Sequence, residues 1–274
     1  LFERTLDMQE GTLERRVLWE TAVGKQVLIE SKRLVSLPYR HVAAISYQIT
    51  ILNADAPVVI SSEVVGDRPN QASVNDPRQS KGFQHKVLLP QEHFADEMRL
   101  LMTHRARNSG MTIACGVDHL IESEARYNFS NECDGDHGKV VYSINARRGK
   151  VINIIKFITY HSSRHAATSE LATRAERTLN RVKQEGFASL VAGQKAFMDD
   201  FWERSDIYIE GHSSAVGRHK HETQQAMRWN LFQILQASAR AEGTGIPSKG
   251  LTGQTYEGHY FWETAIYVMP FLIY

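Results

Sequence analysis

The sequence predicts a β-rich α+β protein in which an antiparallel β-sandwich is followed by helices. Two observations support this prediction. Apolar side chains recur at every second position over much of residues 1–160, and no helical pattern lies between these runs. After residue 165 they recur at steps of three and four, which is the period of a helix buried along one face. At about 150 residues per domain, the 274 residues suffice for one or two domains.

The clearest strand has four apolar positions separated by polar ones, at Ile45, Tyr47, Ile49 and Ile51. Successive side chains of a strand point to opposite faces, so this strand should be half-buried. About eight strands are predicted in all, the others at 12–20, 25–35, 57–65, 98–102, 111–117, 142–145 and 151–160. The short run 147–150, which contains Gly149, predicts a hairpin between the last two. The polar, proline-bearing stretch 66–95 predicts a long surface loop.

Three helices are expected after the strands. Thr168 or Ser169 should cap the first, whose apolar stripe is Leu171, Ala175, Leu179 and Val182. Gly186 should break it, and a second helix should continue to Trp202. A short extended piece is expected at 207–209 and a third helix at about 215–240. The apolar segment 260–274 predicts a further helix that Pro270 interrupts.

Charge and cysteine content exclude several classes of protein. Lys and Arg number 32 against 31 Asp and Glu, and a net charge of +1 argues against binding nucleic acid. No apolar run approaches the ~18 residues of a membrane span, so no membrane partner is expected. Two cysteines exclude a disulfide framework, and a reducing, cytoplasmic location is the simpler expectation.

No metal site is predicted. His219 and His221 stand two residues apart and would face different sides of a helix. His161 and His165 have the i, i+4 spacing but lie at a strand end without a Glu between them, so we interpret them as solvated polar residues. The Gly-rich run 243–253 contains Ser-Lys-Gly where a phosphate loop has Gly-Lys-Ser/Thr, which argues against a nucleotide site.

The densest candidate site is the run 256–264, where aromatic rings flank a carboxylate and an imidazole beside glycines. Sugar sites are often built this way, because rings cover the apolar face of the sugar and carboxylates accept hydrogen bonds from its hydroxyls. The alternative is an aromatic helix that packs into a core.

This run also resembles a stretch of glycoside hydrolase family 65, of the form Gly-Leu-Thr-Gly-x-x-Tyr-x-Gly-His-x-Phe-Trp-Asp-Thr-Glu followed by an apolar run through Pro-Phe. The matching residues here extend from Gly250 to Ala265 and then over Met269-Pro270-Phe271. Four further stretches resemble the family, at 33–37, 56–62, 201–211 and 224–232. The resemblance therefore spans nearly the whole chain.

The resemblance implies an architecture. An antiparallel β-super-sandwich would occupy residues 1–165, linker helices 166–211, and the first helices of a truncated (α/α)6 barrel 212–274. The apolar run that ends at Tyr274 would then lack its partner helices. We expect that run to be exposed or covered by a non-native contact.

The resemblance also implies site residues. Trp262 and Glu263 match the Trp-Asp pair with which the family holds the glucosyl unit at the bond to be cleaved. Supporting roles fall to three more residues, Arg228, His259 and Phe261. Glu263 and Ala265 depart from the Asp and the acidic residue of the family stretch. The extra methylene of Glu263 moves its carboxylate by about 1 Å, and an error of that size can cost ~10²-fold in rate.

The reaction implied by the resemblance is inverting phosphorolysis of a disaccharide such as maltose, trehalose or kojibiose, although the family also contains hydrolases. A glutamic acid protonates the glycosidic oxygen while phosphate attacks from the opposite face. In the family this acid and the phosphate loop lie downstream of the Trp-Asp pair. No catalytic residue is therefore assigned in this chain, which we expect to be a fragment, inactive by itself.

The partners implied are an α-linked glucosyl disaccharide and inorganic phosphate as co-substrate, with no cofactor. The resemblance also makes a homodimer a candidate assembly, since members of the family are commonly dimers. The alternative function is a non-catalytic β-sandwich module that binds carbohydrate or contacts another subunit.

Overall fold

The computed structural model describes residues 1–66, 86–209, 217–238, 245–246, 250 and 261–273. The chain divides into two compact units, which are described in turn. The first unit holds the described residues of Leu1–Pro69 and His85–Phe197, and the second holds those from Met198 onward. Every strand that the structure describes lies in the first unit.

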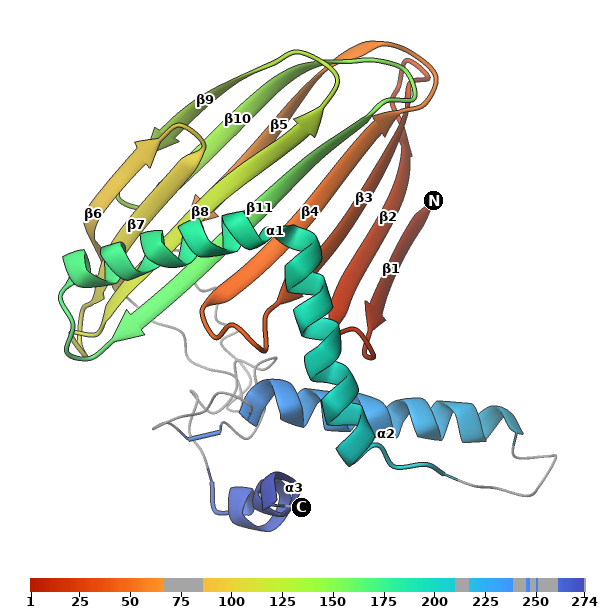
Figure 1. Cartoon of the computed structure of the whole chain (residues 1–274), viewed down its shortest axis with the longest axis vertical. Coiled ribbons are helices and arrows are strands. Elements are labelled where there is room, and N and C mark those ends of the chain that lie inside the picture. Colours follow the sequence, from red (N-terminus) through yellow and green to blue (C-terminus); the bar gives the residue numbers. More distant parts are fainter. Residues whose placement is uncertain (67–85, 210–216, 239–244, 247–249, 251–260, 274) are drawn as a thin grey trace, which may run out of the picture. The chain divides into compact units, whose positions relative to one another are not determined.

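The first unit is a sandwich of two antiparallel sheets (Figure 1). The large sheet has eight strands in the order β1-β2-β3-β4-β11-β8-β7-β6, and the small sheet has three in the order β5-β10-β9. This arrangement confirms the β-rich α+β class with an antiparallel sandwich. The strands of the large sheet are β1 (Phe2–Asp7), β2 (Thr12–Glu20), β3 (Gln26–Val35), β4 (Val42–Ile51), β6 (Leu88–Asp96), β7 (Arg99–Ala106), β8 (Thr112–Ser123) and β11 (Val151–Ser163). Those of the small sheet are β5 (Ala56–Val65), β9 (Tyr127–Cys133) and β10 (His137–Ala146).

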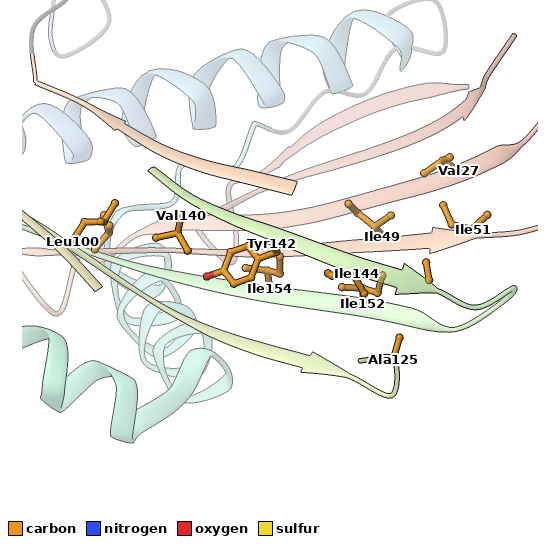
Figure 2. Packing of buried hydrophobic residues seen from close by; sticks show 12 residues of the cluster. Val27, Ile49, Ile51, Leu100, Ala125, Val140, Tyr142, Ile144, Ile152 and Ile154 are labelled. Carbon is orange, nitrogen blue, oxygen red and sulfur yellow. The ribbon is translucent and has the colours of Figure 1, made fainter. Parts of the chain in front are cut away.

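The core between the two sheets is formed by alternate residues of their strands. Ile49 and Ile51 of β4 and Ile152 and Ile154 of β11 face the small sheet, as the period-2 pattern requires. Tyr142 of β10 lies fully buried among them, as Figure 2 shows. The register confirms the predicted strand over 45–51 and places it beside both β3 and β11.

The opposite face of the large sheet is covered by the first part of α1 (Thr168–Ser205). The predicted stripe of this helix is confirmed, because Leu171, Ala175, Leu179 and Val182 are all at most 1% exposed. Phe157 of β11 packs against Leu179, and Gly116 of β8 makes room for the same side chain. A Cβ on Gly116 would stand 2.9 Å from a Leu179 methyl carbon, closer than carbon atoms approach.

Gly186 breaks α1 as predicted. Its backbone angles are φ 78° and ψ 162°, a conformation that only glycine adopts readily. The bend redirects the helix so that Leu190 packs into the same cluster as Leu34. One turn further, the buried Gln194 accepts a hydrogen bond from the Leu37 amide at 2.9 Å, which fixes the second segment of α1 to the end of β3.

Two predictions about loops are wrong. The stretch 66–95 includes β6, an edge strand whose residues are only partly buried and therefore lack a clear alternation; residues 67–85 lie outside the described part. The run 147–150 does not form a hairpin, because β10 pairs with β5 and β9 whereas β11 pairs with β4 and β8. It is an arch from one sheet to the other, closed by a 2.7 Å hydrogen bond from the Gly149 amide to the Ile51 carbonyl.

A buried carboxylate joins the large sheet to α1. Asp118 of β8, whose side chain is 3% exposed, accepts hydrogen bonds from Arg99 of β7 at 2.7 and 2.9 Å. It also accepts one from Lys183 of α1 at 2.9 Å. Burial opposes its ionisation, but the hydrogen bonds from Lys183 and Arg99 outweigh burial and hold the pKa of Asp118 below its ordinary value.

Two buried histidines are structural. His119 links the sheets, because its ring nitrogens lie 2.7 Å from the Met98 carbonyl and 2.7 Å from the Ser62 hydroxyl. Burial lowers its pKa to about 4. His161 stacks on His41 with ring centres 4.1 Å apart, and burial likewise lowers its pKa to about 4. The interpretation of His161 as a solvated residue is therefore wrong, because the pattern could not show that α1 covers it.

The second unit contains the end of α1, the helix α2 (Gly217–Ser238), a π-helical turn η2 (Thr264–Val268) and α3 (Met269–Ile273). The segment 264–273 is helical as expected, but Pro270 does not interrupt it, because η2 passes directly into α3. Pro270 lies in the first turn of α3, where the missing N–H is tolerated. The π turn precedes it, with the Met269 amide bonded to the Thr264 carbonyl. None of the described helices is long and apolar enough to cross a bilayer.

Candidate functional site

The structure places Trp262 and Glu263 at the start of the helical segment that continues through η2 and α3. Both residues are exposed, and Trp262 is 71% exposed. Glu263 has helical backbone angles and makes no capping hydrogen bond through its side chain. An exposed aromatic residue is thus followed directly by an exposed carboxylate, and these are the two residue types that sugar sites combine.

Arg228 of α2 is bound to the chain segment that leads into α2. Its guanidinium donates two hydrogen bonds to the two carboxylate oxygens of Asp206, at 2.9 and 2.6 Å. The Arg228 hydrogen bond is the main reason that the pKa of Asp206 lies below its ordinary value, and Asp206 in turn raises the pKa of Arg228. This ion pair connects α2 to the segment before it, and the predicted supporting role of Arg228 in the site stays a prediction.

Gln224, one turn before Arg228, holds the same segment. Its side chain accepts a hydrogen bond from the Ile209 amide at 2.9 Å and donates one to the Ile207 carbonyl at 2.8 Å. Residues four apart lie on one face of a helix, so Gln224 and Arg228 bind the segment 206–209 together. Sequence reasoning missed Gln224 and Asp206, although the i, i+4 spacing of two polar side chains on α2 was a usable signal.

α3 is anchored by an aromatic contact. The Phe271 ring lies 6.2 Å from the ring of Phe201, which is buried near the end of α1 and also packs on Trp202. The other side of α3 and η2 is apolar and open, with Tyr267 71% and Ile273 67% exposed. This confirms the expectation that the apolar run near the end of the sequence is exposed.

The remaining predicted residues are Phe261 and His259. Phe261 precedes Trp262, so three of the five predicted residues are consecutive in the sequence, and the structure leaves all three exposed. Arg228 is instead engaged with Asp206. His259 and most of the Gly-rich run lie outside the described residues.

The comparison with known families matches two separate stretches of the chain, residues 1–201 and 228–274. The family description "Glycosyl hydrolase family 65, N-terminal domain" matches residues 1–201, which include the whole sandwich. The chain belongs to glycosyl hydrolase family 65. The central catalytic domain of the family matches residues 228–274, which include Arg228, Trp262 and Glu263.

Relatives in family 65 match the chain from end to end. It is 38% identical to an uncharacterised glycosyl hydrolase of Mycobacterium tuberculosis over 99% of this chain and 34% of the relative. It is 33% identical to the α,α-trehalose phosphorylase of Thermoanaerobacter brockii over 100% of this chain and 34% of that enzyme. A kojibiose phosphorylase of Escherichia coli is 26% identical over 98% of this chain and 34% of its own length.

A solved structure, described as a putative kojibiose phosphorylase from the human microbiome, shares the fold. It superposes with a TM-score of 0.84 at 21% identity and covers 100% of this chain and 33% of its own. The chain spans about a third of the length of the family 65 proteins that it matches.

Proposed function

We propose that this chain is part of an inverting α-glucoside phosphorylase, and that Trp262 and Glu263 bind the glucosyl unit of its disaccharide. The observation that carries the proposal is the exposed Trp262–Glu263 pair at the start of a helical segment, within the stretch that matches the family's catalytic domain. The indole face would cover the apolar side of the sugar ring, and the carboxylate would accept hydrogen bonds from its hydroxyls. Inorganic phosphate would be the co-substrate.

Phosphorolysis rather than hydrolysis is supported by the names of the trehalose and kojibiose relatives. Phosphate is already anionic, so the enzyme would need one acid to protonate the leaving oxygen and a pocket for phosphate. We place both outside these 274 residues, with the sandwich at 1–165, the linker at 166–211 and the start of the (α/α)6 barrel at 212–274. This chain alone would then release no glucose 1-phosphate. We also propose that the enzyme is cytoplasmic.

The test compares this chain with the longer polypeptide that contains it. Each is incubated with maltose, trehalose or kojibiose, with and without phosphate, and the anomer of the glucose 1-phosphate product is read by NMR. The longer polypeptide should form the β anomer from an α-linked substrate only when phosphate is present. Turnover by this chain alone, product of retained configuration, or equal glucose release without phosphate would each contradict the proposal.

Two variants of the longer polypeptide test the site. Trp262→Ala and Glu263→Ala should each reduce kcat/KM by ~10²-fold or more, because positioning errors of about 1 Å already have that effect. Glu263→Asp restores the residue of the family stretch and should retain activity or increase it. Tyr267→Ala, which removes another exposed ring a turn away, is the matched control and should leave kcat/KM within about twofold.

A further inference from the structure

The two sheets of the sandwich differ greatly in width. The small sheet has three strands and the large sheet eight, so β5-β10-β9 covers only part of the inner face (Figure 1). β1, β2 and β3 extend past β5, which is the edge strand of the small sheet on that side. On the part of the chain that the structure describes, no strand pairs with the other edge of β5.

An apolar groove of about 640 Å³ lies between this edge and the uncovered inner face. Its lining comes from β2, β3, β4 and β11 on one side and from β5 on the other. Most of the lining is aliphatic or aromatic, with Trp19, Ile29, Tyr47, Ile49, Val58 and Ile60 as its main apolar members. Trp19 is still 55% exposed, so the groove leaves a large apolar ring in water.

The groove continues the core of the sandwich. Ile49 is buried in the cluster between the sheets, and Ile29, Tyr47, Val58 and Ile60 pack against that same cluster. The side chains that line the groove therefore belong to the inner face of the sandwich, and the core ends only because the small sheet ends at β5. A sheet face of this kind is normally covered by a second sheet at ~10 Å.

The edge of β5 favours a strand as the occupant. β5 is ten residues long, from Ala56 to Val65, and its pairing with β10 is regular over its whole length. Every second residue of such an edge directs its N–H and C=O outward, which forms a template for another strand. A sugar is a poorer fit, because the largely aliphatic lining would leave most of its hydroxyls without hydrogen-bond partners.

We propose that a strand of the same, longer polypeptide, from outside these 274 residues, pairs with the free edge of β5 and closes the groove. Its alternate apolar side chains would pack on Ile29, Tyr47 and Trp19, and its backbone would satisfy the outward groups of β5. Two observations identify this occupant. The groove is continuous with the inter-sheet core, and the relatives are about three times as long as this chain, so ample polypeptide is available.

Hydrogen exchange of β5 tests the proposal in this chain and in the longer polypeptide. Amides of β5 that bond to β10 should be protected in both. Those on the other edge should exchange rapidly in this chain and become protected on the order of 100-fold in the longer polypeptide. Equally rapid exchange in both would overturn the proposal. So would protection that increases with protein concentration together with dimer formation, or a gene that encodes no residues beyond these 274.

Adjacent residues of β2 provide a matched pair of variants. Trp19 faces the groove, whereas Leu18, which is 36% exposed, points to the opposite face. Trp19→Lys should lower the Tm of the longer polypeptide by several degrees more than it lowers the Tm of this chain, since only there would the ring be buried. Leu18→Lys should change both equally. Equal effects of Trp19→Lys on the two proteins would contradict the proposal.

Discussion

Asp118 offers the sharpest test of how the helix and the sheet are joined. It is a buried carboxylate between Arg99 of β7 and Lys183 of α1, at 2.7 and 2.9 Å. Asp118→Asn keeps the size of the side chain but removes its charge and turns an amide NH2 toward two cationic donors. Removing one member of a buried pair typically costs 3–5 kcal/mol, mainly because the partner charge stays buried and unpaired.

The expected cost lies at the lower end of that range. The side chains of Arg99 and Lys183 are 21% and 31% exposed, so water can partly solvate them once the carboxylate is lost. We therefore expect about 3 kcal/mol, which corresponds to a fall in Tm of about 6–12 °C for a unit of this size. The folded-state pKa of Asp118 is lowered. The stability from its charge is therefore fully present above the unfolded pKa and is lost as pH falls through the folded pKa.

Urea unfolding followed by circular dichroism at neutral and acid pH measures both effects. The difference between wild type and Asp118→Asn should be about 3 kcal/mol at pH 7 and should shrink below pH ~4. Glu124→Ala is the control, because Glu124 pairs with Lys150 at 2.9 Å in an ion pair that is largely exposed. It should cost less than ~1 kcal/mol. A loss for Asp118→Asn no larger than that of Glu124→Ala would refute the reasoning.

Three further substitutions test the sandwich and its helix. His119 has a pKa of about 4 because it is buried, so its own contribution to the free energy of unfolding should fall by about 3 kcal/mol between pH 6.5 and 4. His119→Gln should remove that contribution and leave the one from His161, which has a similar pKa. Gly186→Ala should lower the free energy of unfolding by about 1–3 kcal/mol, because alanine does not adopt the backbone angles of the bend readily. If α1 were straight at this position, the same substitution would raise the free energy of unfolding by about 1 kcal/mol, so the sign of the change in urea unfolding tests the bend. Leu179→Ala should lower the free energy of unfolding by about 2–5 kcal/mol, because it leaves a cavity under α1. Arg177 is exposed on the same helix, and Arg177→Ala should cost about 0.5 kcal/mol or less. A similar Tm for the two variants would contradict the packing of α1.

Of the strands that the sequence predicted, β5 and β10 have one more deeply buried face, whereas β7 and β11 are buried on both faces. Ile45 to Ile51 alternate because β4 has a sheet on one side, and Leu171 to Val182 repeat at helical spacing because α1 buries one stripe. β1, β6 and β9 were missed, since each is an edge strand with few buried residues and therefore little alternation.

Connections were harder to predict than elements. The run 147–150 has the glycine and the length of a hairpin turn, but it crosses between sheets. A short turn has the same local chemistry in both cases, because Gly149 supplies the positive φ of 70° either way. Residues far away in the sequence decide whether the two flanking strands pair with each other. The Ile51 carbonyl accepts a hydrogen bond from the Gly149 amide, and β4 pairs with β11 in place of β10.

For the candidate site, the sequence alone determined the residue types and the order of Trp262 and Glu263, and the resemblance to family 65 gave that pair its meaning. Only the tertiary structure decided which of the predicted residues are available. In the structure Trp262 is exposed, and Arg228 is hydrogen-bonded to Asp206, 22 residues earlier in the chain. Among the described residues, the structure also leaves the inner face beside β5 without a covering strand. The spacing of residues along a helix or strand determines on which face each side chain lies. Segments distant in the sequence determine what packs against that face.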